Sequence, residues 1–110
     1  MSDYFKEINA AVTVCDTEGF VIWMNEKAKI VNHGDFTDKS LLDCHPEPAK
    51  NKLLDLMQNQ KTNTYTIEKG EIKKMIYQSP WYKNGIFAGI VELSFEIPFE
   101  MPHYIRNIKP

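Results

Sequence analysis

Residues 11–25 have the sequence AVTVCDTEGFVIWMN, and this stretch decides the fold more than any other part of the chain. Ala11–Val14 and Phe20–Met24 are short runs of β-prone residues. Between them, Asp16–Gly19 has the composition of a tight turn that ends in a glycine able to adopt a positive φ. Asn25 follows the second run, and its side chain can cap the start of a helix. The stretch predicts a β-hairpin followed directly by a helix.

Helical patterns stand on either side of this hairpin. Residues 2–9 can form a short N-terminal helix, and residues 26–31 fit about two helical turns after Asn25. The clearest helix covers residues 49–60, where leucines and a methionine recur at helical spacing and form one apolar stripe. Pro46 and Pro48 precede it and suit a helix start rather than a helix interior.

From residue 62 onward the pattern changes to a period of two, which indicates strands. We expect strands over 62–68, 72–79 and 87–97, joined by turns at Lys69-Gly70 and Asn84-Gly85. In the last strand, Val91, Leu93 and Phe95 alternate with polar residues, so we expect the long helix to pack against these three side chains. The order of elements predicts an α+β domain with one antiparallel sheet and its helices on one face.

The chain has 110 residues, which fits a single domain. A net charge of −2 argues against a basic nucleic-acid-binding face. No apolar run approaches the ~20 residues that span a bilayer, and the charged N-terminus lacks a signal-peptide core. We therefore expect a cytoplasmic protein that binds neither nucleic acid nor membrane, with Cys15 and Cys44 as free thiols.

Three stretches together resemble a PAS (Per-Arnt-Sim) sensor domain. Residues 11–25 look like its opening strand, Asp-x-x-Gly turn, second strand and Asn, and residues 25–28 are similar to the start of its first helix. Residues 80–91 look like its last hairpin, with Gly85 and Gly89 in the expected places. Glu96-Ile97-Pro98 stands where such domains often end in Asp-Ile-Thr, so the usual connection to an output helix is altered.

The resemblance implies a five-stranded antiparallel sheet in the order 2-1-5-4-3 and a cavity between the sheet and the helices. It also implies dimerisation through the N-terminal helix and the outer sheet face. We expect one PAS-like domain over residues 1–110, with a core at about 5–98 and a C-terminal tail at 99–110. Because the tail keeps several large apolar residues, we expect it to pack on the domain or on another copy.

Cys44-His45-Pro46-Glu47-Pro48 concentrates the side-chain chemistry of the chain just before the long helix. His45 is the candidate ligand for haem or a metal ion, and a similar Cys-His-Pro element occurs in PAS domains of bacterial regulatory proteins. The alternative is a histidine bonded to the backbone near a helix start. Cys44 is either a small buried side chain or a thiol made reactive by the helix N-terminus.

Other cofactors have weaker support. The helix that carries the reactive cysteine in flavin-binding PAS domains has no counterpart here, so flavin is not expected. Cys44 and His45 are adjacent, which does not match zinc-ligand spacing. Apart from Cys44 and His45, the candidate cavity-wall residues are large and mostly aromatic: Trp23, Met57, Tyr77, Trp81 and Leu93.

Two functions follow from this reading. The first is a sensor for a small molecule or cofactor that signals through protein contacts, with a homodimer and an unknown output protein, for example in transcription regulation. The second is a ligand-free dimerisation or interaction module of a bacterial signalling system. The sequence holds no catalytic motif, so we do not expect an enzyme.

Overall fold

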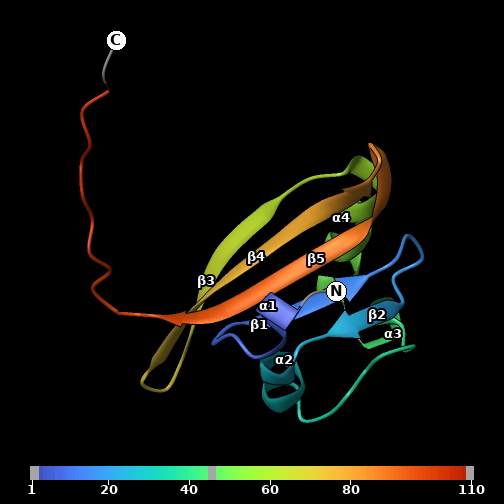
Figure 1. Cartoon of the computed structure of the whole chain (residues 1–110), viewed down its shortest axis with the longest axis horizontal. Helices are drawn as coiled ribbons and strands as arrows, with labels where there is room; N and C mark the ends of the chain where they lie inside the picture. The colour runs from blue at the N-terminus through green and yellow to red at the C-terminus, as the bar shows by residue number, and fades with distance from the viewer. Residues whose placement is uncertain (1–2, 45–46, 109–110) are drawn as a thin grey trace.

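A computed structural model describes residues 3–44 and 47–108 of the chain. Its five strands form one antiparallel sheet in the order β2-β1-β5-β4-β3 (Figure 1). The helices are α1 (Asp3–Lys6), α2 (Glu26–Val31), α3 (Leu41–Cys44) and α4 (Ala49–Asn59), and the strands are β1 (Ala11–Cys15), β2 (Val21–Met24), β3 (Asn63–Lys69), β4 (Ile72–Lys83) and β5 (Ile86–Ile97). The α+β class and the strand order predicted from the sequence are confirmed.

The turn of the first hairpin is closed by Asp16. Its Oδ1 atom accepts hydrogen bonds from the backbone N–H groups of Glu18 at 2.9 Å and Phe20 at 3.0 Å. Gly19 follows with a φ of +87°, a conformation that glycine adopts without strain. The predicted hairpin turn therefore forms as the sequence indicates.

Asn25 joins three elements. Its Oδ1 accepts from the N–H of Ala28 in the first turn of α2 and from the N–H of Val12 in β1, each at 2.9 Å. Its Nδ2 donates to the carbonyls of Phe5 at 2.9 Å and Ala10 at 2.7 Å. The side chain is fully buried, so these bonds replace the water that it loses. The predicted helix cap is confirmed, and the same amide also holds the segment that leads into β1.

The core forms where α4 meets the sheet. Leu53, Leu56 and Met57 of α4 pack in one buried cluster with Cys15 of β1 and Ile90 of β5. The apolar stripe of the long helix is thus the covered side, as its spacing predicts. A second cluster lies beside α2 and contains Ala11, Val21, Met24 and Ala28.

The packing of β5 is opposite to our expectation. Ile90 packs with α4, and successive residues of a strand point to opposite faces. Glu92 and Ser94 therefore share the helix-covered face with Ile90, which we call the inner face. Val91, Leu93 and Phe95 lie on the outer face, so the prediction that the long helix packs against them is wrong.

A β-bulge near the β4–β5 turn sets the register of this hairpin. Tyr82 pairs with Phe87, but the next pair along the strands is Trp81 with Gly89, which leaves Ala88 unpaired. Gly89 has a φ of +141°, and a Cβ atom there would lie 1.9 Å from the carbonyl oxygen of Cys15. Only glycine allows β1 and β5 to approach this closely.

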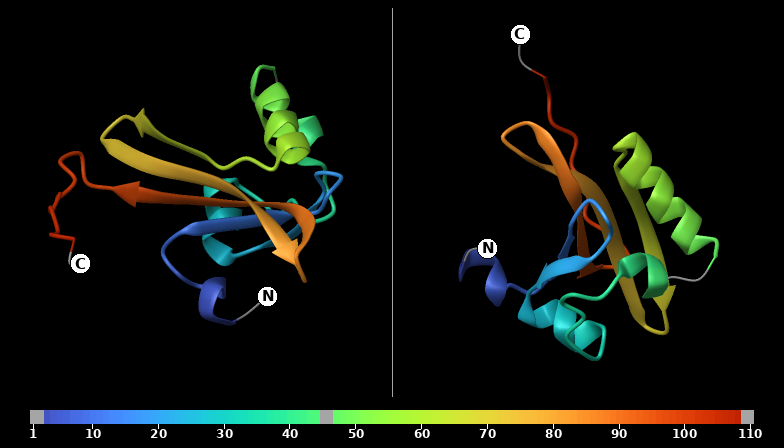
Figure 2. Two further views of the ribbon diagram at one scale, coloured as in Figure 1. Left: turned by 90° about the horizontal axis from the view of Figure 1, so that it is seen from above. Right: turned by 90° about the vertical axis from the view of Figure 1, so that its right-hand side faces the viewer.

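The two ends of the chain extend beyond the sheet. α1 is shorter than the predicted 2–9 helix, and it lies on the opposite side of the sheet from α4 (Figure 2). Residues 99–108 are exposed and lead away from the domain (Figure 1). The tail therefore does not pack on its own domain. No helix in the described ranges is both long and apolar enough to cross a membrane.

Candidate functional site

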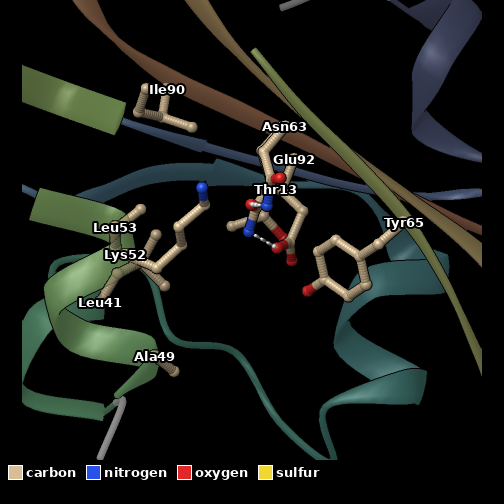
Figure 3. A pocket seen from close by; sticks show the side chains of 10 residues that line it. Thr13, Leu41, Ala49, Lys52, Leu53, Asn63, Tyr65, Ile90 and Glu92 are labelled. Atoms are coloured by element: carbon tan, nitrogen blue, oxygen red, sulfur yellow. Dashed lines mark hydrogen bonds between the residues drawn. The ribbon is translucent and has the colours of Figure 1, made fainter. Parts of the chain in front are cut away.

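Three adjoining hollows lie on the inner face, and all three are lined by Thr13 of β1 and Glu92 of β5. The one beside α4, which we call the central hollow, has a volume of about 150 Å³ (Figure 3). The second extends toward α2 and measures about 480 Å³, and the third, over β3 and β4, measures about 340 Å³. The helical layer thus leaves the middle of the inner face uncovered, and Glu92 stands at the point that the hollows share.

A row of polar side chains crosses three strands beneath the central hollow. Asn63 of β3 pairs with Gln78 of β4, which pairs with Glu92 of β5, so all three point to the inner face. Asn63 Nδ2 donates to Gln78 Oε1 at 3.0 Å, and Gln78 Nε2 donates to Glu92 Oε1 at 2.8 Å. We call Asn63, Gln78 and Glu92 the polar row. The row ends in a carboxylate, the strongest acceptor among the three side chains.

The negative charge of Glu92 acts on its neighbours. Burial raises the pKa of the Tyr65 hydroxyl, and the charge of Glu92 raises it further. Burial also raises the pKa of the Cys15 thiol to about 11, with smaller contributions from the carboxylates of Asp16 and Glu92. Both side chains therefore stay protonated at neutral pH, and Glu92 supplies the negative charge on this part of the inner face.

The opposite wall of the central hollow comes from the helices. Leu41, Ala49, Leu53 and Lys52 line it, together with Ile90 of the sheet. Figure 3 shows the Lys52 side chain extending from α4 toward the sheet, on the same side of the hollow as Leu53. The hollow therefore combines an apolar wall, a polar floor and one charge of each sign.

No protein-family model matches the chain, and no curated protein matches its sequence. Solved structures do resemble it. A sensory box sensor histidine kinase from Vibrio cholerae superposes with a TM-score of 0.66 at 11% identity, over 89% of this chain and 89% of that one. The PAS domain of a protein from Colwellia psychrerythraea gives a TM-score of 0.62 at 18% identity, over 86% and 91% of the two chains. The chain has the PAS fold.

A third structure with this fold is described as a dual PAS-heme oxygen sensor, the Aer2 receptor from Vibrio cholerae. It superposes with a TM-score of 0.59 at 13% identity, over 81% of this chain and 95% of that one. At such identities the PAS fold is shared, whereas the ligand has to be argued from the residues of this chain.

Several predicted cavity-wall residues lie elsewhere in this fold. Tyr77 pairs with Leu93, and Trp23 pairs with Val14, which puts all three predicted residues on the outer face. Trp81 pairs with Gly89, and its Nε1 donates to the carbonyl of Cys15 at 2.9 Å. The placement of these four residues around a cavity is wrong, because the alternation of the strands turns them away from the helices.

Met57 is on the predicted side of the sheet, but it is buried in the core cluster and does not line any of the three hollows. Cys44 is the last residue of α3, and His45 lies outside the described residues. The proposed roles of Cys44 and His45 thus stay predictions.

The described lining of the central hollow does not fit haem. It contains neither histidine nor cysteine, and the central hollow carries Lys52, Glu92 and two amides in place of an apolar slot. Among the residues that the structure describes, no group of three or more His, Cys, Asp and Glu side chains could hold a metal ion. The donor set instead suits a small polar molecule.

Six polar or tyrosine residues of the central hollow were not predicted as site residues: Thr13, Lys52, Asn63, Tyr65, Gln78 and Glu92. Each is a polar or tyrosine side chain in a pattern that reads as a solvated surface. The one available signal is the turn at Lys69-Gly70, which sets Asn63 opposite Gln78 once the turn length is known.

Proposed function

We propose that this PAS domain is a sensor that binds a small polar ligand on its inner face, at Glu92 and the polar row. The observation that carries the proposal is that a hydrogen-bonded row of Asn63, Gln78 and Glu92 lies inside a hollow. Polar groups that converge in a partly apolar hollow are typical of ligand sites. In this proposal the signal leaves the domain through contacts with another protein.

The proposed route for the signal runs through β5. Glu92 faces the hollow, and its neighbours Val91 and Leu93 face outward, so a ligand that moves Glu92 also moves the outer face. If β5 has two arrangements, a ligand shifts the equilibrium between them only as far as it binds one more tightly than the other. A partner bound to the outer face would sense that difference.

A thermal-shift screen against a library of metabolites tests the proposal. A ligand at 100 times its Kd stabilises the folded state by about 2.7 kcal/mol, which raises the Tm by about 10 °C in a domain of this size. Gln78→Leu should abolish the shift, because it interrupts the polar row. Ser79→Ala is the matched control, since Ser79 lies next along β4 on the outer face, where its Oγ donates to the Pro80 carbonyl. A Tm unchanged by every compound would refute the proposal.

The second candidate function is a ligand-free interaction module, and the outer face favours it. The side chains of Tyr77, Val91, Leu93 and Phe95 lie there and are at least partly exposed. We propose a homodimer through this face, which would bury apolar surface that the monomer leaves in water. The two functions are compatible, since the ligand and the second copy would occupy opposite faces.

A further inference from the structure

The central hollow holds one anionic and one cationic side chain, and this combination restricts the ligand beyond the proposed function on which the inference rests. Glu92 stands on the floor and Lys52 on the helical wall. No ion pair within 4.0 Å joins these two side chains in the described structure. Each charge is thus available to a ligand.

The Glu92 carboxylate determines which atoms donate and which accept in the hydrogen bonds of the polar row. A carboxylate only accepts hydrogen bonds, so Gln78 must present its NH₂ group to Glu92 and its carbonyl oxygen to Asn63. Asn63 must then donate to Gln78, and its own Oδ1 stays free. Within the described part of the chain, Asn63 Oδ1 and Glu92 Oε2 accept no hydrogen bond. The unused capacity of the row is therefore accepting, and an ammonium group with three N–H donors matches it.

Lys52 adds the opposite requirement. Its nearest acidic neighbour on α4 is Asp55, which already accepts hydrogen bonds from Asn59 and Lys61. Those two bonds lower the pKa of Asp55 more than Lys52 does. Lys52 is therefore not the main partner of Asp55. A ligand that carried only an ammonium group would leave Lys52 unpaired and would be repelled by it.

The formal charges of Glu92 and Lys52 cancel, so a ligand with one group of each sign satisfies both. Leu41, Ala49, Leu53 and Ile90 leave an apolar wall for the remainder of such a molecule. The central hollow by itself, at about 150 Å³, has room for a molecule the size of valine. We infer that the central hollow binds a free α-amino acid with a small aliphatic side chain, with its ammonium group at Glu92 and its carboxylate at Lys52.

Calorimetric titration with L-valine and two truncated analogues tests this inference. Isobutylamine lacks the carboxylate, and isovalerate lacks the amine, while both keep the branched chain. We expect the affinity of each analogue to be at least tenfold weaker than that of L-valine, or of the tightest binder among the proteinogenic aliphatic amino acids. Equal binding of isobutylamine and the amino acid would overturn the inference.

Two variants assign the two ends of the ligand. Glu92→Gln keeps the size of the side chain and should weaken amino-acid binding at least tenfold without weakening isovalerate binding, because the variant also removes the repulsion between two carboxylates. Lys52→Met should weaken amino-acid binding to a similar degree without weakening isobutylamine binding, because the variant also removes the repulsion between Lys52 and an ammonium group. Glu96→Gln and Lys50→Met are the matched controls, since they make the same charge changes outside the hollow. Equal losses in a variant and its control would contradict the assignment.

The experiments distinguish failure of the amino-acid inference from failure of the proposed sensor function. If the metabolite screen yields a ligand but no aliphatic amino acid binds, the amino-acid inference fails and the sensor proposal stands. If Gln78→Leu and the wild-type protein respond alike to every compound, both fail.

Discussion

At the scale of single residues, the burial of Cys15 makes the stability of the domain depend on pH. Burial raises the pKa of its thiol from 9.0 to about 11, so the unfolded chain loses this proton first as pH rises. The buried, protonated thiol therefore contributes its full share to the free energy of unfolding below pH 9, and this contribution is lost between pH 9 and 11. At about 1.4 kcal/mol per pH unit, we expect a loss of about 2 to 3 kcal/mol.

Urea denaturation at pH 8 to 11 measures this effect in the wild type and in Cys15→Ala. The alanine variant should be less stable throughout, because a buried side chain is removed, and its stability should fall less steeply above pH 9. Lysines and tyrosines titrate in the same range in both proteins, so the difference between the two curves isolates Cys15. Parallel curves would show that the thiol does not titrate differently in the folded state.

Asn25 shows how far residue-level prediction reaches. Its role as a helix cap follows from the sequence, because the residue stands between a β-prone run and a helical one. Its bonds to Val12, Ala10 and Phe5 do not, since they depend on how the preceding segment folds back. The His45 prediction had no comparable structural constraint and rested on chemistry alone.

At the scale of elements, the existence and type of the strands and the long helix follow from periodicity, but the covered face of the sheet does not. Alternation shows that β5 has two different faces without showing which one the helices cover. The bulge matters as well. Without it, the register beyond Tyr82 and Phe87 would place Gln78 opposite Val91, and the polar row would not form. Nothing in the sequence around Ala88 except Gly89 signals that bulge.

The orientation of α4 can be tested with Leu56→Ala. Leu56 is fully buried between Cys15, Ile90 and its helical neighbours, so we expect a loss of about 3 kcal/mol in the free energy of unfolding. Leu54→Ala makes the same change at a partly exposed position of the same helix and should cost less than about 1.5 kcal/mol. Similar losses for the two variants, measured by urea denaturation, would mean that the helix is rotated.

At the scale of the whole molecule, the fold places two surfaces of different character back to back. The inner face is hollow and carries the polar row, and the outer face is apolar and carries Val91, Leu93 and Phe95. The PAS fold itself could be predicted from three short motifs in order. The face that the helices cover could not be predicted, because alternation separates the residues of a strand into two sets without showing which set lies under the helices.

Leu93→Asp distinguishes the two possible orientations of the sheet. On the inner face, the substitution would bury an unpaired carboxylate and unfold the domain. On the outer face, where the structure places Leu93 beside Val12 and Tyr77, the charge can reach solvent. We expect a folded protein whose Tm falls by only a few degrees. The proposed homodimer should be lost, because the two copies of the new aspartate would repel each other across the two-fold axis.

Light scattering after size exclusion gives the mass, and circular dichroism gives the fold and the Tm. Ile86→Asp is the control, since Ile86 is 72% exposed at the β4–β5 turn, away from the centre of the outer face. Loss of the dimer in Leu93→Asp alone would assign the interface to the outer face. A folded dimer of Leu93→Asp would place the interface elsewhere, and an unfolded protein would mean that the helices cover the face on which Leu93 lies.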